Sequence, residues 1–389
     1  MVARADLGVY VHIPFCATRC DYCAFATWTD RAHLIDEYLD ACVTDVARRC
    51  ADGRLTDAAT VYFGGGTPSL VPADRLMRIL DAVPRTHDAE VTVECNPDSI
   101  DATKLRTYRA AGVTRVSLGV QSTQPHVLAA LGRTHDRANV ARAVDAIGAA
   151  GLSTFNLDVI AGTAGESDAD FEATLEDVLG FDPPHVSVYG LTVEPGTPLE
   201  RRVAAGDVAA PDPDVQADRY LRADARLTAR GLGWYEVSNW ARAGHECRHN
   251  QGYWAGADCV AIGAAAHGHD AVAGTRTWNA PLPERYVERI RAGSSPEVGH
   301  ETADPEARAR ELLGLALRTR DGARVDRTPT VHDLEALGLV TYTDGAAVLT
   351  ARGRLLATEV TLRILGDGAE TRIGTRYDGL PIPEPARPT

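Results

Sequence analysis

The chain has 389 residues, 44% of them hydrophobic, which is enough to bury the core of one large domain and a smaller one. Its 54 acidic residues outnumber the 40 basic ones, and the resulting net charge of -14 is poorly suited to gripping nucleic acid phosphates. No apolar stretch is long enough to span a bilayer and no charged-then-apolar leader opens the chain, so we expect a cytoplasmic protein. Eight cysteines in a chain of this length argue against a small secreted disulfide scaffold.

Short apolar runs alternate with longer amphipathic segments through the first half of the chain. The runs, which we predict to be strands, are Leu7–His12, Thr60–Phe63, Glu90–Glu94, Arg115–Val120, Thr154–Ile160 and His185–Tyr189. The segments between them, which we predict to be helices, are Leu34–Cys50, Asp74–Ala82, Asp101–Ala111, Ala138–Ala150 and Asp168–Leu179. This repeated alternation predicts an α/β fold in which a parallel sheet with crossover helices forms a partial (β/α)6 barrel of the TIM type.

The pattern changes after about residue 200. A helix over Asp214–Arg230 and a strand over Gly233–Val237 come before a stretch rich in Gly, Ala, His and Trp, and a helix over Pro283–Ala292 follows that stretch. A second series of helix, helix, two short strands and helix then occupies Pro305–Leu317, Val331–Leu337, Leu339–Tyr342, Ala347–Leu349 and Ala351–Leu365. We therefore expect a barrel over residues 1–235, an extension over 236–300, a small α+β, winged-helix-like domain over 301–375 and a disordered, Pro-rich tail over 376–389.

Three cysteines lie in one short loop directly after the first predicted strand, with the spacing C-x3-C-x2-C at Cys16, Cys20 and Cys23. Thiolates are the preferred ligands of iron–sulfur clusters, and three of them on a [4Fe–4S] cubane leave one iron open for chemistry. Two alternatives are a zinc ion held by the same cysteines plus His12, although structural zinc sites usually have two separated ligand pairs, and a disulfide, which would leave one cysteine over. The spacing and the position after a strand favour the cluster.

Polar and glycine residues follow or interrupt the next four predicted strands. Gly64–Pro68, with the sequence Gly-Gly-Gly-Thr-Pro, follows the second strand, Glu94 ends the third, and Gln121, Arg133 and Asp158 lie at or near the ends of the fourth and fifth. Because the carboxyl ends of parallel strands meet at one edge, we expect these residues to form one rim around one ligand. The glycines would let backbone approach that ligand or would simply form a tight turn. Glu94 would bind a hydroxyl or ammonium group or make a salt bridge, and Asp158 needs a partner if it is buried.

These motifs resemble the coproporphyrinogen dehydrogenase group of radical S-adenosylmethionine (SAM) proteins, in which SAM chelates the open iron and an electron from the cluster cleaves it to a 5′-deoxyadenosyl radical. The matching segments, which extend to about residue 366, include Tyr10-Val-His12-Ile-Pro-Phe15-Cys16, Gly64–Pro68, Val93-Glu94-Cys-Asn96-Pro97, Gly119-Val120-Gln121-Ser122, Leu131-Gly132-Arg133 and Asn156-Leu157-Asp158. The resemblance implies that Cys16, Cys20 and Cys23 ligate the cluster. It implies that the SAM chelated to the cluster is bound by Tyr10, Gly65 and Glu94. A second set matches positions that hold a second SAM in the dehydrogenase, and it consists of Tyr22, Gly66, Thr67, Gln121, Arg133 and Asp158.

Within this group the chain resembles the HemW family of heme chaperones more than the dehydrogenase. Phe25 stands where the dehydrogenase has a fourth cysteine, only fifteen residues precede Cys16, and His249-Asn-Gln-Gly-Tyr253-Trp254 matches the H-N-x-x-Y-W motif of that family. The resemblance implies that heme is bound and passed to acceptor hemoproteins, with His249 as the first residue to test as its ligand. From the residues alone, His249 could equally pack the extension against the barrel.

Two other functions stay open at this point. One is an oxygen-independent coproporphyrinogen III dehydrogenase, which the shared SAM rim favours, and the other is a zinc-stabilised barrel used for protein interaction. For the chaperone we expect heme, acceptor hemoproteins and no nucleic acid as partners, and we allow for a reductant protein, a homodimer and peripheral contact with a membrane through an acceptor.

Overall fold

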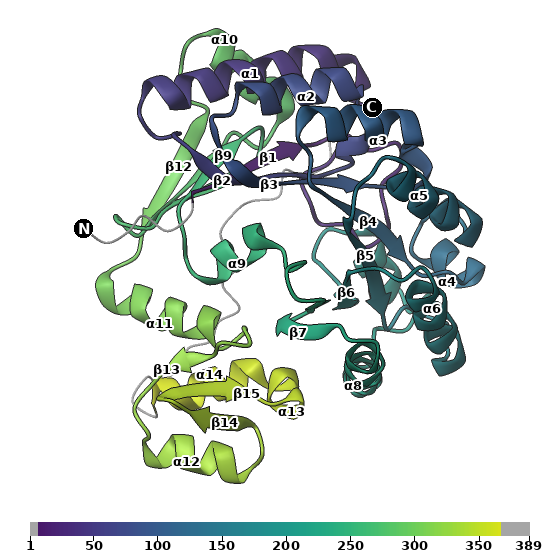
Figure 1. The fold of residues 1–389 in the computed structure, drawn as a ribbon, viewed down its shortest axis with the longest axis vertical. Coiled ribbons are helices and arrows are strands. Elements are labelled where there is room, and N and C mark those ends of the chain that lie inside the picture. Colours follow the sequence, from purple (N-terminus) through teal and green to yellow (C-terminus); the bar gives the residue numbers. More distant parts are fainter. Residues whose placement is uncertain (1–6, 367–389) are drawn as a thin grey trace.

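The structure is a computed structural model that describes residues 7–366. Its centre is a run of six parallel strands, which confirms the predicted parallel sheet. They are β1 (Gly8–Ile13), β2 (Ala58–Gly65), β3 (Arg85–Cys95), β4 (Arg115–Gln121), β5 (Thr154–Ala161) and β6 (His185–Gly190). The sheet curves, so that one face is concave (Figure 1).

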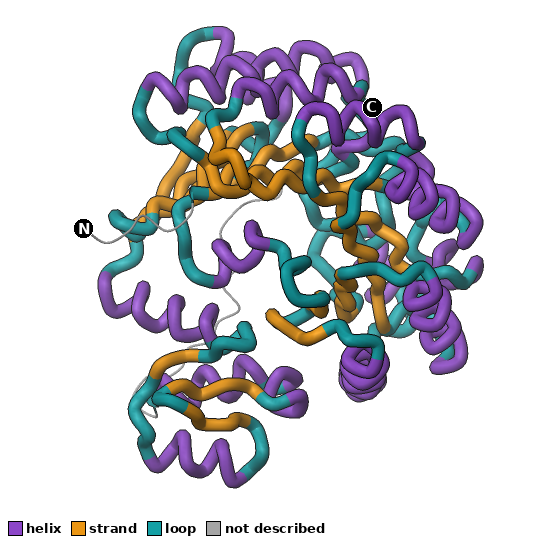
Figure 2. Tube along the Cα trace, viewed as in Figure 1, coloured by secondary structure: helices purple, strands orange, loops and turns teal. Residues whose placement is uncertain are grey.

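Helices cover the convex face of this sheet, as the colouring by secondary structure shows (Figure 2). The crossover helices are α1 (Ile35–Ala51), α2 (Ala73–Ala82), α3 (Ala102–Ala111), α5 (Arg137–Ala149) and α6 (Asp168–Gly180), with the short α4 (Pro125–Ala130) before α5. Apolar side chains of the strands, such as Val61, Phe63 and Val116, pack against the helices and are fully buried. Burial of this face therefore fixes which side chains point the other way, into the concave side.

The sheet continues beyond both ends of the parallel run. At one end β8 (Asn239–Ala241) pairs antiparallel with β6, and β7 (Gly233–Glu236) pairs antiparallel with β8. At the opposite end, β9 (Cys259–Ile262) pairs parallel to β1, followed by β10 (His267–Asp270), β11 (Thr275–Asn279) and β12 (Glu297–Thr302). The stretch from Asn239 to Asn279, for which we predicted no elements, therefore supplies strands on both sides of the barrel.

Four further helices belong to this part of the chain: α7 (Pro198–Ala204), α8 (Pro213–Ala229), α9 (Arg248–Trp254) and α10 (Pro283–Arg291). Helix α9, which carries the H-N-x-x-Y-W motif, lies on the concave side of the sheet, whereas α8 lies outside it (Figure 1). None of the helices in the part of the chain that the structure describes is long and apolar enough to cross a membrane.

The C-terminal part forms a small unit around a three-stranded antiparallel sheet. Its elements are α11 (Pro305–Ala316), β13 (Ala323–Arg324), α12 (Pro329–Ala336), β14 (Val340–Thr343), β15 (Ala346–Leu349), α13 (Ala351–Leu355) and α14 (Ala357–Leu365). The prediction of one helix over Ala351–Leu365 is wrong, because the backbone leaves the helical region at Leu356 (φ -116°, ψ 26°). The break lets α13 contact α8 through the Arg354–Asp224 ion pair, at 2.8 Å, while α14 packs on α11 and α12. The predicted disordered tail lies outside the described residues.

Candidate functional site

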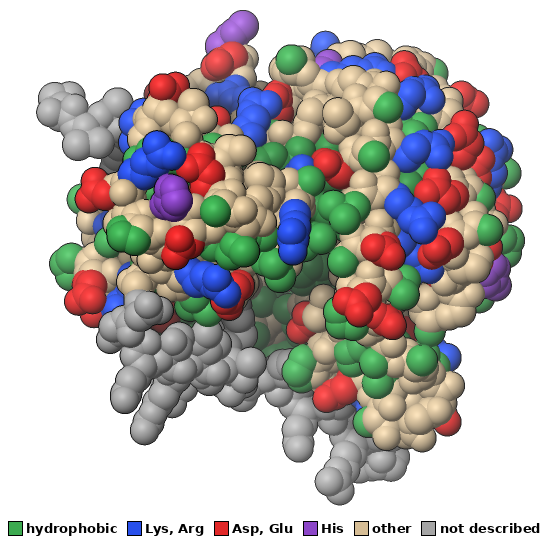
Figure 3. Space-filling view, turned by 90° about the horizontal axis from the view of Figure 1, so that it is seen from below, with side chains coloured by type: hydrophobic (Ala, Val, Ile, Leu, Met, Phe, Trp, Pro, Cys, Tyr) green, Lys and Arg blue, Asp and Glu red, His purple; other side chains and the backbone are tan. Residues whose placement is uncertain are grey.

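The concave face of the sheet encloses a cavity of about 660 Å³. Alternate residues of β4, β5 and β6 line it, and on β4 these residues are Arg115, Ser117, Gly119 and Gln121. The cysteine loop borders the cavity at the carboxyl ends of the strands. The loop before α9, with Cys247, and α9 itself, with Asn250, border it as well. In the space-filling view the molecule is hollowed on one face, and hydrophobic side chains gather around that hollow (Figure 3).

The three cysteines lie together at the mouth of this cavity, as the sequence predicted. All three line the cavity, are half-buried and are free of disulfides. Thr67 donates a hydrogen bond to Cys16 Sγ at 3.6 Å, and Arg133 donates one to Cys20 Sγ at 3.6 Å. Desolvation by burial raises the pKa of the Cys16 and Cys23 thiols. Three thiols with hydrogen-bond donors aimed at two of them, in a loop open to a cavity, fit a cluster that has one iron left for a ligand.

His12 does not complete a zinc site with these cysteines. Its Nε2 is 2.9 Å from the carbonyl of Ala26, and its Nδ1 is 3.1 Å from the hydroxyl of Tyr10, so both ring nitrogens are engaged. Burial lowers the pKa of His12 to about 4, which keeps the ring neutral. Across the described residues, no three His, Cys, Asp or Glu side chains converge on a position for a single metal ion. A cubane takes its thiolates on different iron atoms, so its cysteines need not converge on one point.

The glycine run after β2 packs against the cysteine loop. A Cβ on Gly66 would lie 2.7 Å from the Phe15 carbonyl oxygen and 3.0 Å from Cys16 Sγ, and a Cβ on Gly65, whose φ is +110°, would lie 2.5 Å from the His12 ring. Both glycines also line the cavity. Because Gly65 and Gly66 have no side chains, the segment after β2 can pack directly against the segment that leads into the cysteine loop, a role that the sequence pattern did not predict. The same two glycines leave their backbone accessible to a ligand in the cavity.

Tyr10 lies behind this run, outside the set of described residues that line the cavity. Its ring stacks on Tyr62 with 6.2 Å between the ring centroids, and its hydroxyl contacts His12. The structure thus places Tyr10 where it supports residues of the cavity wall.

Glu94 points into the cavity near the cysteine loop. Its carboxylate accepts hydrogen bonds from the Tyr62 hydroxyl at 2.8 Å and from the Gly65 amide at 3.1 Å. Burial raises the pKa of Glu94 to about 7, more than these two hydrogen bonds lower it, and no described basic side chain is among the groups that shift it. The alternative of a rim salt bridge is therefore wrong. A buried carboxylate near neutrality is instead suited to receive a cationic or hydroxyl group of a ligand.

We expect Glu94→Gln to flatten the fall in stability of the apoprotein between pH 5 and pH 8. The native pKa of about 7 exceeds the ordinary value of 4.5, so the folded state binds the proton more tightly and stability falls as pH rises through this window. The full difference corresponds to roughly 3 kcal/mol, and glutamine should abolish this pH dependence because it does not titrate. Its amide oxygen can still accept the hydrogen bond from the Gly65 amide, while its NH2 group would face the Tyr62 hydroxyl, which can accept. Urea unfolding of both proteins at pH 5.5 and 8 measures this. Parallel pH profiles for the two proteins would contradict the assignment.

Arg133 is held by protein groups at the same rim. Its Nη2 donates to the Asn96 side-chain oxygen at 2.9 Å and to the Gly119 carbonyl at 2.8 Å, in addition to the Cys20 contact from Nη1. These contacts fix the guanidinium, so Arg133 orients Cys20 in this structure.

Gln121 ends β4 with a positive φ of 64°, a conformation that is uncommon for residues other than glycine and turns the chain at the cavity wall.

Asp158 has the partners that its burial requires. It accepts hydrogen bonds from the Asn156 side chain at 2.6 Å and from Ser117 at 3.3 Å, and burial raises its pKa. Thr67, besides contacting Cys16, accepts a hydrogen bond from the Asn96 side chain at 3.4 Å. Both residues line the cavity together with Gly66.

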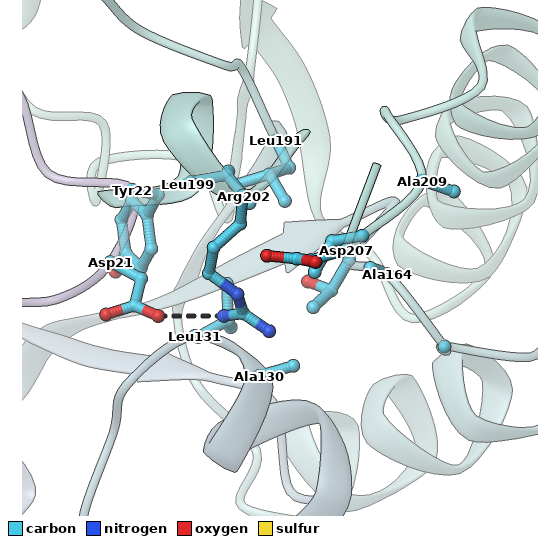
Figure 4. Close-up of a pocket in the computed structure, with 13 residues that line it drawn as sticks. Asp21, Tyr22, Ala130, Leu131, Ala164, Leu191, Leu199, Arg202, Asp207 and Ala209 are labelled. Carbon is cyan, nitrogen blue, oxygen red and sulfur yellow. Dashed lines mark hydrogen bonds and ion pairs between the residues drawn. The ribbon is translucent and has the colours of Figure 1, made fainter. Parts of the chain in front are cut away.

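Tyr22 separates the cavity from a second, smaller pocket of about 320 Å³ and lines both. In this pocket Arg202 of α7 and Asp21 face each other and form an ion pair at 2.9 Å, with Asp207 beside them (Figure 4). The backbone of Asp21 is also hydrogen-bonded to Leu131 and Leu199. The segment between Cys20 and Cys23 is thus anchored to two other parts of the barrel.

His249 lies at the amino ends of β1 and β2, away from the cysteines. Its Nδ1 is 2.8 Å from the Thr60 hydroxyl, and its ring stacks on Tyr62 with 5.1 Å between the centroids. Burial lowers its pKa to about 4. It is not among the described residues that line the cavity, although Tyr62, against which it packs, is one of them. The packing role is what these contacts show, while Nε2 makes no hydrogen bond to another described residue.

Comparison with known proteins agrees with this arrangement. A family profile of the radical SAM superfamily matches residues 10–178. A heme chaperone HemW of Mycobacterium tuberculosis is 45% identical over 373 residues, which cover 92% of this chain and 95% of that protein. The chain belongs to the HemW family of radical SAM proteins. HemW of Bacillus subtilis is 32% identical over 92% of this chain and 99% of its own length.

The fold also matches a solved structure of the radical SAM enzyme coproporphyrinogen III oxidase (HemN) from Escherichia coli. The TM-score is 0.78 with 22% identity, over 92% of this chain and 90% of that one. At this identity the likeness establishes the fold, which is the predicted radical SAM barrel with a small C-terminal α+β unit. The family membership confirms the resemblance stated from the motifs.

Proposed function

We propose that the chain is a cytoplasmic heme chaperone that holds a [4Fe–4S] cluster and SAM, binds heme and passes it to acceptor hemoproteins. The observation that carries this proposal is the 45% identity over 92% of the chain to a protein named heme chaperone HemW. Phe25 supports it, because this side chain, 68% exposed beside Cys23, stands where the dehydrogenase has a fourth cysteine.

In this proposal Cys16, Cys20 and Cys23 hold the cluster, which supplies an electron to SAM when both are bound. Gly65 and Glu94 hold the SAM at the open iron. No side chain of the described residues covers the Gly65 backbone on the cavity side, and the Glu94 carboxylate can accept a hydrogen bond from an ammonium or hydroxyl group. Tyr10 supports this wall from behind through Tyr62 and His12.

For the six residues that match a second SAM site in the dehydrogenase, we propose a role in shaping the cavity and not in binding a second SAM. Arg133, Asp158 and Thr67 already have protein partners, and Arg133 and Thr67 donate to cluster cysteines. Tyr22 and Gln121 line the same cavity, as does Gly66. We infer that these six residues shape the cavity around the cluster, and that a second SAM would have to displace some of their hydrogen bonds.

An anaerobic turnover assay separates the chaperone from the dehydrogenase. The protein with reconstituted cluster is incubated with SAM, a reductant and coproporphyrinogen III, and the products are separated by chromatography. We expect no protoporphyrinogen above a control without protein. Conversion by many turnovers would establish the dehydrogenase and end the chaperone proposal.

Heme binding by the H-N-x-x-Y-W segment is tested on His249. We expect His249→Ala to lose or shift the Soret band of the heme complex, because only Nε2 of this ring remains to bind iron. His332→Ala, at an exposed position on α12, serves as the control and should leave the band unchanged. An unchanged band in His249→Ala would remove this residue as a ligand and leave it with its packing role.

The acceptor and the source of electrons follow from the same proposal. Transfer of heme to an apo-hemoprotein, followed by the acceptor's own spectrum, tests the chaperone step directly. The electron for SAM would come from a reductant protein in the cell.

A homodimer is a further part of the proposal. Size-exclusion chromatography with and without heme tests whether two copies of the chain associate.

A further inference from the structure

Two buried polar side chains at the amino end of the cavity have few protein partners. Thr92 on β3 and Arg115 on β4 are neighbours in the register of the sheet, and both line the cavity. Their exposed fractions are 1% and 2%. Neither residue belongs to the motifs that carry the family resemblance, and the cluster and SAM contacts described above use neither.

The hydroxyl of Thr92 has no hydrogen-bond partner among the described residues. The guanidinium of Arg115 makes one hydrogen bond within the described part of the chain, from Nη1 to the His245 carbonyl at 2.8 Å, and no carboxylate there forms an ion pair with it. Removing such groups from water without compensation is costly. A cation and a hydroxyl donor side by side, both turned to the same cavity, are therefore suited to an anionic group of a ligand.

Glu90, a carboxylate that helps to raise the pKa of Arg115, is hydrogen-bonded to other groups. Glu90 accepts hydrogen bonds from the backbone amides of Arg248 and His249, each at 3.1 Å, and from the Cys247 thiol at 3.5 Å. Glu90 and Cys247 raise the pKa of Arg115, so the guanidinium is charged. Glu90 thus ties the α9 segment to β3, and Arg115 remains available on the cavity side.

We infer that Arg115 and Thr92 bind a carboxylate of the cargo, which in the proposed heme chaperone, on which this inference rests, is a propionate of the porphyrin. A guanidinium can grip a carboxylate with two parallel N–H donors, and the Thr92 hydroxyl can add a third. Arg115 and Gln121 are six positions apart on β4, roughly 20 Å along an extended strand. This anchor is therefore distinct from the end of the cavity at which the cysteines would hold SAM.

The test is a titration of the full-length protein with hemin and with hemin dimethyl ester, in which both propionates are esterified. We expect the wild type to prefer hemin, and Arg115→Gln to lose roughly tenfold to a hundredfold in hemin affinity with little change for the ester. Arg115→Lys should recover part of the preference, because it keeps the charge without the fork. Arg106→Gln, which removes an exposed arginine on the outer helix α3, is the matched control and should bind as the wild type does.

Thr92→Val keeps the test valid if Arg115→Gln fails to fold. Because the hydroxyl has no partner among residues 7–366, valine should keep or raise the melting temperature, while hemin affinity falls roughly fivefold. Equal binding of hemin and its ester by the wild type overturns the inference but leaves heme binding intact. Preference for hemin that survives in both Arg115→Gln and Thr92→Val also overturns it. Failure of the wild type to bind either compound overturns the heme proposal itself, and the propionate assignment with it.

Discussion

Cys20→Ala is expected to abolish the cluster and to leave the barrel folded. The thiol lies at the cavity mouth, half-buried in a loop, so its removal takes away a ligand but little packing. After anaerobic reconstitution, bound iron should fall from about four atoms per chain to near zero, and the broad visible absorption should vanish. The free energy of unfolding of the apoprotein should change by no more than about 0.5 kcal/mol.

Cys50→Ala is the control for this experiment. Cys50 is also half-buried, but it lies on α1, outside the set of described residues around the cavity, and this variant should keep its iron. Loss of folded protein in Cys20→Ala alone, with zinc instead of iron in the wild type, would show that the loop holds a structural metal.

Arg219→Ala should cost about 3–5 kcal/mol of folding stability, because it leaves a buried carboxylate without its cation. Arg219 on α8 donates to Glu166 at 2.6 Å, and the two residues are 3% and 8% exposed. Glu166 also accepts hydrogen bonds from the Gly162 and Thr163 amides at 2.8 and 3.3 Å. The pair therefore holds α8 against the loop after β5, whose residues line the pocket beside Tyr22.

Arg222→Ala provides the comparison on the same helix. Its ion pairs with Asp168 and Glu172 are on the surface, so its loss should cost less than about 1 kcal/mol. Urea unfolding of the apoproteins gives both values. The double variant Arg219→Met/Glu166→Gln should recover part of the loss, since no unpaired charge remains. Similar small losses for Arg219→Ala and Arg222→Ala would mean that the loop relaxes and that water reaches Glu166.

The parallel half of the fold could be predicted from the sequence because its strands are buried on the helix side and form short apolar runs rich in Val, Leu and Ile. The run Thr60–Phe63 lies inside β2, and Arg115–Val120 differs from β4 by one residue. The strands between Asn239 and Asn279 could not be predicted in this way. They are three to five residues long, and β10, with the sequence His-Gly-His-Asp, has no apolar alternation, so only pairing with neighbours far along the chain makes it a strand.

The site shows the same division between local and distant determinants. The cysteine spacing and the glycine run are local patterns, and the structure brings both to one cavity mouth. The orientation of Arg133 towards Cys20, and the pairing of Thr92 with Arg115, depend on which strands are neighbours and in which register. A charged residue, Arg115, opens a strand whose alternate residues Val116, Leu118 and Val120 are apolar. The direction of the Arg115 side chain becomes known only once the sheet is assembled.

The place of β1 between β2 and β9 has a consequence for biosynthesis. The strand that leads into the cysteine loop pairs on one side with Ala58–Gly65 and on the other with Cys259–Ile262, which leaves the ribosome much later. At ordinary translation speeds the delay between these two partners is roughly 10 to 40 s. During that time the nascent loop is attached to an incomplete sheet, so delivery of iron and sulfide should succeed mainly after translation has ended. A ribosome-stalled chain that stops before residue 259 should therefore retain no cluster, whereas the released chain does.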